Sequence, residues 1–90
     1  MSNKKSKQNL QSLYELIANL QSAQDVQKFL EDLCTASELQ AMSQRLQSAK
    51  LLLSGKTYTE VIEETGISSA TLSRVSKCVK FGKGYKKFAK

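Results

Sequence analysis

Apolar residues at helical spacing run through the whole chain, and none of its 90 residues is proline. Side chains three, four and seven positions apart share one face of an α-helix. Such stripes occupy Leu10–Leu20, Val26–Leu33 and Leu39–Leu53, and a shorter one contains Val61 and Ile62. No segment of useful length alternates apolar and polar residues as a β-strand would. The sequence therefore predicts an all-α fold.

Capping signals indicate where several of these helices begin and end. The T-x-x-E pattern lets a threonine hydroxyl and a glutamate carboxylate satisfy backbone groups at a helix start, and it occurs at Thr35–Glu38 and Thr57–Glu60. A weaker variant begins at Ser22. Gly55 and Gly66 follow the third and fourth stripes, where glycine commonly ends a helix in the left-handed conformation.

The composition argues against catalysis and metal binding. The chain contains no histidine, and its two cysteines, Cys34 and Cys78, form no C-x-x-C pair. Histidine is both the commonest metal ligand and the commonest general base. We therefore expect no enzyme activity, no metal ion and no cofactor.

The N-terminal sequence and the hydropathy predict a cytoplasmic protein. Residues 1–12 are basic and polar, and no apolar stretch of the signal-peptide kind follows them. The longest aliphatic run, Leu51–Leu53, is far shorter than the roughly 18 residues that a transmembrane helix needs. We expect a cytoplasmic chain with no membrane span and with reduced thiols.

Positive charge is concentrated near the end of the chain. The formal net charge is +6, from 14 basic and 8 acidic residues. Residues 1–66 hold seven of the bases and all eight acids, whereas residues 67–90 hold the other seven bases and no acid. Such a segment predicts a partner that carries phosphates or anionic headgroups. The alternative is a basic tail that only aids solubility.

The segment after Gly66 predicts a helix with two contrasting faces. Ser68 is a suitable N-cap. Leu72, Val75 and Val79 recur at i, i+3 and i+7 as the side that would be buried. The opposite side carries small, hydroxylated or basic side chains: Ser69, Ala70, Ser73, Arg74, Lys77 and Lys80.

Two short helices, predicted at Thr57–Thr65 and Ser69–Lys80 and joined at Gly66, form a helix-turn-helix pattern. Such a motif buries apolar side chains between its helices. The residues at the expected offsets from the glycine are Val61, Ile67, Leu72 and Val75. Ile62 departs from the pattern, because such motifs usually hold a small residue there. A purely structural corner between two helices is the alternative.

The second helix of this motif coincides with the basic segment, and this coincidence predicts binding to double-stranded DNA. Small residues at the helix start let its amides approach a phosphate or a base edge. The long basic side chains behind them can reach bases or phosphates in the major groove. The predicted DNA-contacting residues are Ser68, Ser69, Ala70, Thr71, Ser73, Arg74, Lys77 and Lys80.

A helical interaction module is the competing hypothesis. The tail contains Phe81, Tyr85 and Phe88 among four lysines, so it could bind an anionic membrane or an acidic protein. The i, i+4, i+7 spacing of the aromatic residues favours another interpretation. It predicts a short helix after Gly84 that buries all three side chains on a dimer.

Two neighbouring runs also carry a family resemblance: S-E-L-Q-A-M-S-Q-R-L-Q-S-A-K-L-L-L-S-G and Y-T-E-V-I-E-E-T-G-I-S-S-A-T-L-S-R-V. Over residues 34–80 the chain resembles the tryptophan repressor family, and the most specific part is Ala70–Arg74. Within that family it is most similar to the small Trp-repressor-like regulators of Gram-positive bacteria. The resemblance implies an intertwined helical homodimer that represses transcription and places two helices in successive major grooves, about 34–36 Å apart.

The resemblance further implies where a ligand pocket would lie. The two arginines that hold the indole ring of tryptophan in the repressor match Arg45 and Arg74. The neighbouring glycine is replaced by Val75, and a serine that helps bind the ligand's amino group is replaced by Cys78. Because Val75 lies on an apolar stripe, we predict that it occupies the pocket and that tryptophan is not a co-repressor. We expect no small-molecule effector, although the sequence does not specify what signal, if any, modulates binding. Alternatively, Arg45 pairs with a nearby acid such as Glu38 or with a helix carbonyl, and Arg74 contacts only phosphate.

These patterns divide a single domain into four parts. Residues 1–9 are predicted to be a flexible basic arm, 10–56 a helical dimerisation and scaffold region, 57–80 the DNA-binding helix-turn-helix, and 81–90 a short basic and aromatic tail. A chain of this size buries only about 60–65% of its unfolded surface. Its own core is therefore marginal, and this favours a partner subunit.

Overall fold

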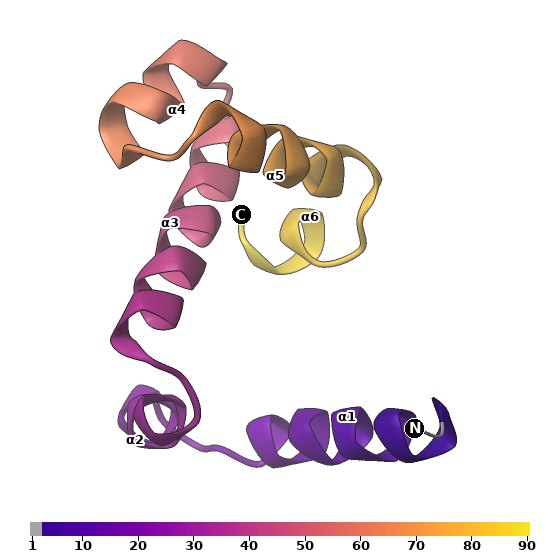
Figure 1. The fold of residues 1–90 in the computed structure, drawn as a ribbon. Helices are drawn as coiled ribbons and strands as arrows, with labels where there is room; N and C mark the ends of the chain where they lie inside the picture. Colours follow the sequence, from indigo (N-terminus) through magenta and orange to yellow (C-terminus); the bar gives the residue numbers. More distant parts are fainter. Residues whose placement is uncertain (1–2) are drawn as a thin grey trace. The chain divides into compact units, whose positions relative to one another are not determined.

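The computed structural model describes residues 3–90, which form six α-helices (Figure 1). They are α1 (Asn3–Ala18), α2 (Ala23–Leu33), α3 (Ala36–Leu53), α4 (Tyr58–Thr65), α5 (Ser69–Phe81) and α6 (Tyr85–Phe88). The described part of the chain contains no β-strand, so the prediction of an all-α fold is confirmed. Within it, no helix is both long enough and apolar enough to cross a membrane.

The helices divide into two compact units, Met1–Thr35 and Ala36–Lys90. The first unit contains α1 and α2. Among the described residues 4–35 no side chain is buried. The large apolar side chains that are exposed there are Leu10, Tyr14, Leu16, Ile17 and Leu33. The apolar faces of α1 and α2 thus form no core of their own.

The start of α1 corrects one expectation from the sequence. Residues 3–9 are helical and do not form a separate arm, because α1 begins at Asn3 and not near Leu10. Lysine and glutamine are good helix formers, so a helix can extend beyond its apolar stripe through such residues. Met1 and Ser2, which belong to the same predicted arm, lie outside the described residues.

The hydrophobic core lies in the unit Ala36–Lys90. There α3 contacts α4, α5 and α6, and α5 also contacts α4 and α6 (Figure 1). The buried cluster consists of Ala49, Val61, Ile67, Leu72 and Val75. All four residues expected at fixed offsets from Gly66 belong to it. Ile62, the residue that departs from the pattern, is half-buried and packs against the edge of this cluster.

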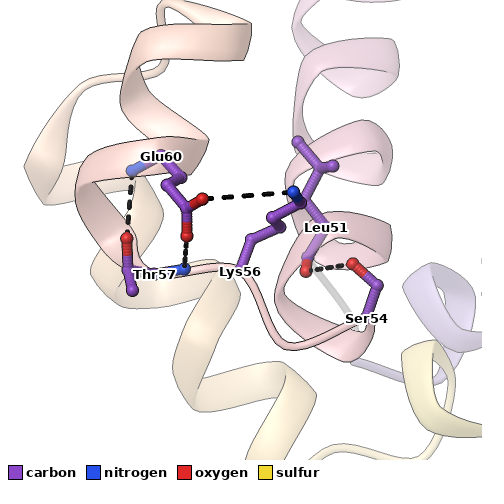
Figure 2. Close-up of polar contacts among 5 residues, drawn as sticks. All are labelled: Leu51, Ser54, Lys56, Thr57 and Glu60. Atoms are coloured by element: carbon purple, nitrogen blue, oxygen red, sulfur yellow. Dashed lines mark hydrogen bonds and ion pairs between the residues drawn. The ribbon is translucent and has the colours of Figure 1, made fainter.

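Local hydrogen bonds explain why α2 and α4 begin where they do. The hydroxyl of Ser22 accepts a hydrogen bond from the backbone N–H of Asp25 at 3.0 Å. At α4 the hydroxyl of Thr57 accepts from the Glu60 N–H at 3.2 Å, and the Glu60 carboxylate accepts from the Thr57 N–H at 2.9 Å (Figure 2). The predicted caps at Ser22 and Thr57 are therefore confirmed.

The turns on either side of α4 require glycine. Gly55 has φ 99° and Gly66 has φ 72°, in the left-handed region where a Cβ atom introduces strain. The first turn is also closed by Ser54, whose hydroxyl donates to the Leu51 carbonyl at 2.7 Å (Figure 2). Two tight turns thus bound α4 and set up the entry into α5.

Candidate nucleic-acid interface

Helix α5 turns one face to the core and the other to solvent. Leu72, Val75 and Ser76 are buried. Of the predicted DNA-contacting residues, only Thr71 is half-buried, and the others are exposed: Ser68, Ser69, Ala70, Ser73, Arg74, Lys77 and Lys80. The separation of apolar and polar faces that the sequence predicts is therefore present.

The hydroxyl groups at the start of α5 differ in whether they already have a hydrogen-bond partner in the chain, and the sequence did not reveal this difference. Ser68 is the N-cap, and its hydroxyl accepts from the Thr71 N–H at 3.2 Å and donates to the Thr71 hydroxyl at 2.9 Å. These two side chains thus stabilise the start of the helix. The exposed hydroxyls of Ser69 and Ser73 have no hydrogen-bond partner within residues 3–90, so they are available to an external ligand.

The basic residues after Gly66 are not neutralised by the chain itself. Lys56 forms an ion pair at 4.0 Å, but with Glu60 of α4, and both residues precede Gly66. All seven basic side chains of the C-terminal segment are exposed: Arg74, Lys77, Lys80, Lys83, Lys86, Lys87 and Lys90. Their positive potential is thus directed at solvent and at any anionic partner.

The capping box of α4 also affects the ionisation of Glu60. The pKa of this carboxyl lies below its ordinary value of 4.5, first because the backbone N–H of Thr57 donates to the carboxylate. The Thr57 hydroxyl and the charge of Lys56 lower the pKa further. The carboxylate form therefore stabilises the helix start that precedes the Gly66 turn.

A cavity of about 450 Å³ lies between α3, α5 and α6. It is lined by Arg45, Thr71, Arg74, Val75, Cys78 and Tyr85. The structure thus brings together the four residues that the family resemblance placed at a ligand pocket. Val75 is only 3% exposed, which confirms its place in the core, but its side chain forms part of the wall and does not fill the whole space.

Two residues of this cavity were not predicted from the sequence. Thr71 stands three residues before Arg74 and four before Val75, so helical periodicity could have placed it on the same face of α5. Tyr85 reaches the cavity from α6. Its position depends on how the tail folds back, and no local pattern specifies that.

The tail forms the short helix α6 directly after Gly84, as its aromatic spacing predicts. Tyr85 is half-buried and packs against the core. Phe81 and Phe88, in contrast, are 80% and 78% exposed. An apolar groove of about 460 Å³ next to Phe88 is lined by residues of α3, α5 and the tail. Burial of all three aromatic residues on a dimer stays a prediction.

The residues that could hold a metal are not grouped together. Within the described part of the chain, no three His, Cys, Asp or Glu side chains are close enough to bind one ion. Cys34 and Cys78 are free thiols. The surface of α5 and the adjoining cavity are thus the features that the structure offers for function.

An all-α chain with an exposed basic helix behind a left-handed glycine turn is typical of helical DNA-binding regulators. The chain belongs to the Trp repressor protein family, whose sequence model matches residues 8–89. This match confirms the resemblance seen in the sequence. Membership of the family implies a DNA-binding regulator rather than an enzyme.

Individual relatives agree with this assignment. The chain is 41% identical over 73 residues to YerC of Bacillus subtilis, a protein of uncharacterised function, and the match covers 81% of this chain and 70% of YerC. A TrpR-like protein from Eubacterium eligens has a similar structure, with a TM-score of 0.86, 37% identity and coverage of 96% of this chain and 90% of that one. A candidate Trp repressor from Staphylococcus aureus gives a TM-score of 0.85 at 34% identity, with coverage of 97% and 90%.

Proposed function

We propose that the chain is a sequence-specific DNA-binding repressor of transcription that acts as a homodimer through a helix-turn-helix formed by α4 and α5. The exposed face of α5 carries this proposal. It combines hydroxyls without internal partners, Ser69 and Ser73, with the basic side chains of Arg74, Lys77 and Lys80. No acidic residue follows Glu64 to repel a phosphate backbone.

The two kinds of side chain on α5 have different roles in this proposal. With the helix in the major groove, Ser69, Ala70, Ser73 and Arg74 face the bases, where hydrogen bonds and methyl contacts distinguish sequences. Lys77 and Lys80 lie further along the helix and contact phosphates, which fix its register without reading sequence. The cap formed by Ser68 and Thr71 keeps the helix start intact.

A second copy of the chain accounts for the apolar surface that remains uncovered. Leu10, Tyr14, Leu16 and Ile17 of α1 and Leu33 of α2 are exposed. Exposed apolar patches of this kind mark interaction surfaces in soluble proteins. A homodimer covers them and also supplies two α5 helices, which suits an operator with two-fold symmetry.

Tryptophan is not the co-repressor in this proposal. The wall of the Arg45–Arg74 cavity contains the side chain of Val75 and the weakly hydrogen-bonding thiol of Cys78. An indole would have to fit beside a valine that belongs to the core, and its amino group would lack a good acceptor at Cys78.

Selection of bound sequences from a random pool of duplex DNA tests the proposal. We expect a palindromic consensus whose half-sites lie one helical turn apart, about 34–36 Å. An asymmetric consensus would contradict the dimer, and recovery of no consensus at all would contradict sequence-specific binding.

The strong exposure of Phe81 and Phe88 favours a second candidate, a module whose tail binds anionic membranes or an acidic protein. Aromatic residues beside lysines bind anionic bilayers through combined apolar and electrostatic contacts. In that case deletion of residues 81–90 would abolish binding to anionic vesicles, and the protein would show little preference among DNA sequences. A DNA consensus that persists after the deletion would instead support the repressor.

A further inference from the structure

The last residue of α4, Thr65, has a side-chain hydroxyl whose hydrogen-bonding capacity is fully used. It donates to the carbonyl of Val61 at 2.7 Å and accepts from the backbone N–H of Ile67 at 3.2 Å. It also accepts from the hydroxyl of Ser48, on α3, at 3.3 Å. A hydroxyl offers one donor and two acceptor positions, so Thr65 fills all three. This one group therefore connects α3, α4 and the residue before the N-cap of α5.

A second side chain of α3, that of Gln44, also forms a hydrogen bond to Thr65. The amide nitrogen of Gln44 donates to the backbone carbonyl of Thr65 at 2.9 Å. Gln44 and Ser48 are four residues apart and therefore lie on one face of α3. Ser48 is completely buried, and Gln44 is half-buried. Hydrogen bonds that are partly shielded from water in this way are stronger than fully exposed ones, and their loss leaves the buried hydroxyl of Ser48 without its partner.

The hydrogen bonds of Thr65 restrict the direction of the chain, which the apolar contacts of the surrounding core do not. Val61 and Ile67 pack through apolar contacts, which have no preferred direction and tolerate small shifts. Gly66, between Thr65 and Ile67, is the most flexible residue type at a turn. Hydrogen bonds on both sides of that glycine restrict the direction in which the chain leaves α4. They therefore restrict where α5 points.

We propose that Thr65, held by Ser48 and Gln44, is a positioning residue for DNA recognition. It fixes the direction in which the chain leaves the Gly66 turn. Ser69, Ser73 and Arg74 therefore have one orientation already in the protein without DNA. The inference rests on the proposed function, and it adds that the orientation of α5 is built into the chain and does not await a small molecule. Preorganisation of this kind favours specific binding because less motion is lost on association.

Two substitutions at Thr65 and a control on the same helix test the inference. Thr65→Val keeps the shape but removes the hydroxyl, and Thr65→Ser retains the hydroxyl. Thr59→Val makes the same chemical change at an exposed threonine of α4. For each protein, affinity is measured for the selected DNA and for unrelated DNA of equal length, well below the unfolding midpoint, and thermal unfolding is recorded separately.

Thr65→Val should weaken binding to the selected DNA about tenfold or more, as expected when base contacts are misaligned. Binding to unrelated DNA should change less than about twofold, because the phosphate-contacting lysines remain. Thr65→Ser and Thr59→Val should both bind like the original chain. A Thr65→Val protein that only melts earlier, with both affinities unchanged when folded, would overturn the inference.

Ser48→Ala provides a milder test that still applies if Thr65→Val does not fold. It removes one of the three bonds to the Thr65 hydroxyl, so it should lower the ratio of specific to non-specific affinity and speed hydrogen exchange at the Ile67 amide. An unchanged ratio would overturn the inference. If the original chain selects no DNA sequence, the proposed function itself fails, and the two failures are thereby distinguished.

Discussion

At the residue scale, the exposed face of α5 separates residues that would read bases from residues that would hold phosphates. Ser73→Ala and Arg74→Ala should each weaken binding to the selected DNA by about 1–3 kcal/mol, because each removes a contact to a base edge. Competition titrations with variant operators would measure this loss and should show relaxed preference at particular base pairs.

Lys80→Ala is the matched comparison on the same helix. Removal of a phosphate contact should weaken binding to all DNA sequences alike and reduce the salt dependence by about one charge. If Arg74→Ala and Lys80→Ala behave identically in both respects, the assignment of α5 as the base-reading helix is wrong.

The cavity wall gives a second prediction at this scale. L-tryptophan should show no saturable binding in the micromolar range by calorimetry, because Val75 narrows the cavity beside Arg74 and the thiol of Cys78 is a weak hydrogen-bond partner. DNA affinity should also be the same with and without tryptophan. Saturable micromolar binding would contradict the prediction directly.

Burial around the Gly66 turn could be predicted from the sequence, but the hydrogen bonds between distant residues could not. The burial of Val61, Ile67, Leu72 and Val75 follows from spacing around one glycine, so it could be predicted from the chain alone. The bond between Ser48 and Thr65 joins residues 17 positions apart and depends on how α3 meets α4. A threonine before a glycine carries no such information by itself.

At the element scale, the start of α4 should be sensitive to acid. The folded pKa of Glu60 is lower than 4.5, so its carboxylate adds stability at pH values above 4.5, and this contribution disappears as the pH falls through the folded pKa. Thermal unfolding between about pH 3 and pH 7 should therefore show a steeper loss of stability in the original chain than in Glu60→Gln.

Two further variants separate charge from capping at this helix. Glu63→Gln is the matched control, because it makes the same chemical change at another exposed glutamate of α4. Thr57→Ala removes the hydroxyl half of the capping box and should lower the free energy of unfolding by about 0.5–2 kcal/mol. The explanation fails if Glu60→Gln loses stability in acid as steeply as the original chain.

Helix ends were predictable where a capping side chain or a left-handed glycine marks them. Ser22, Thr57 and Ser68 each accept a hydrogen bond from a nearby backbone N–H, as their sequence context predicts. The beginning of α1 at Asn3 has no apolar stripe to mark it, so the sequence suggested a flexible arm instead. Likewise, spacing placed α6 correctly, but which of its aromatic residues are covered depends on distant contacts.

At the scale of the whole molecule, the exposed apolar side chains of α1 and α2 predict self-association. The unfolding midpoint should rise with protein concentration, because a folded dimer is favoured by mass action. Sedimentation equilibrium should give twice the chain mass. Leu16→Glu should shift the population to monomer, since Leu16 is 44% exposed in one subunit and would be covered in two.

Gln8→Glu is the control, because Gln8 is an exposed polar residue of the same helix. It should leave both the mass and the concentration dependence unchanged. A chain that sediments as a monomer at all concentrations, with a constant unfolding midpoint, would contradict the dimer.

The lack of buried side chains among residues 4–35 also bears on the turnover of the protein in a cell. Proteases cut backbone that unfolds locally, and segments with few buried contacts unfold most readily. A lone subunit would therefore offer α1 and α2 as cleavage sites, whereas a subunit covered by a second copy would not. Degradation would remove single subunits first. The cellular abundance of the protein would then be set by the amount present as dimer.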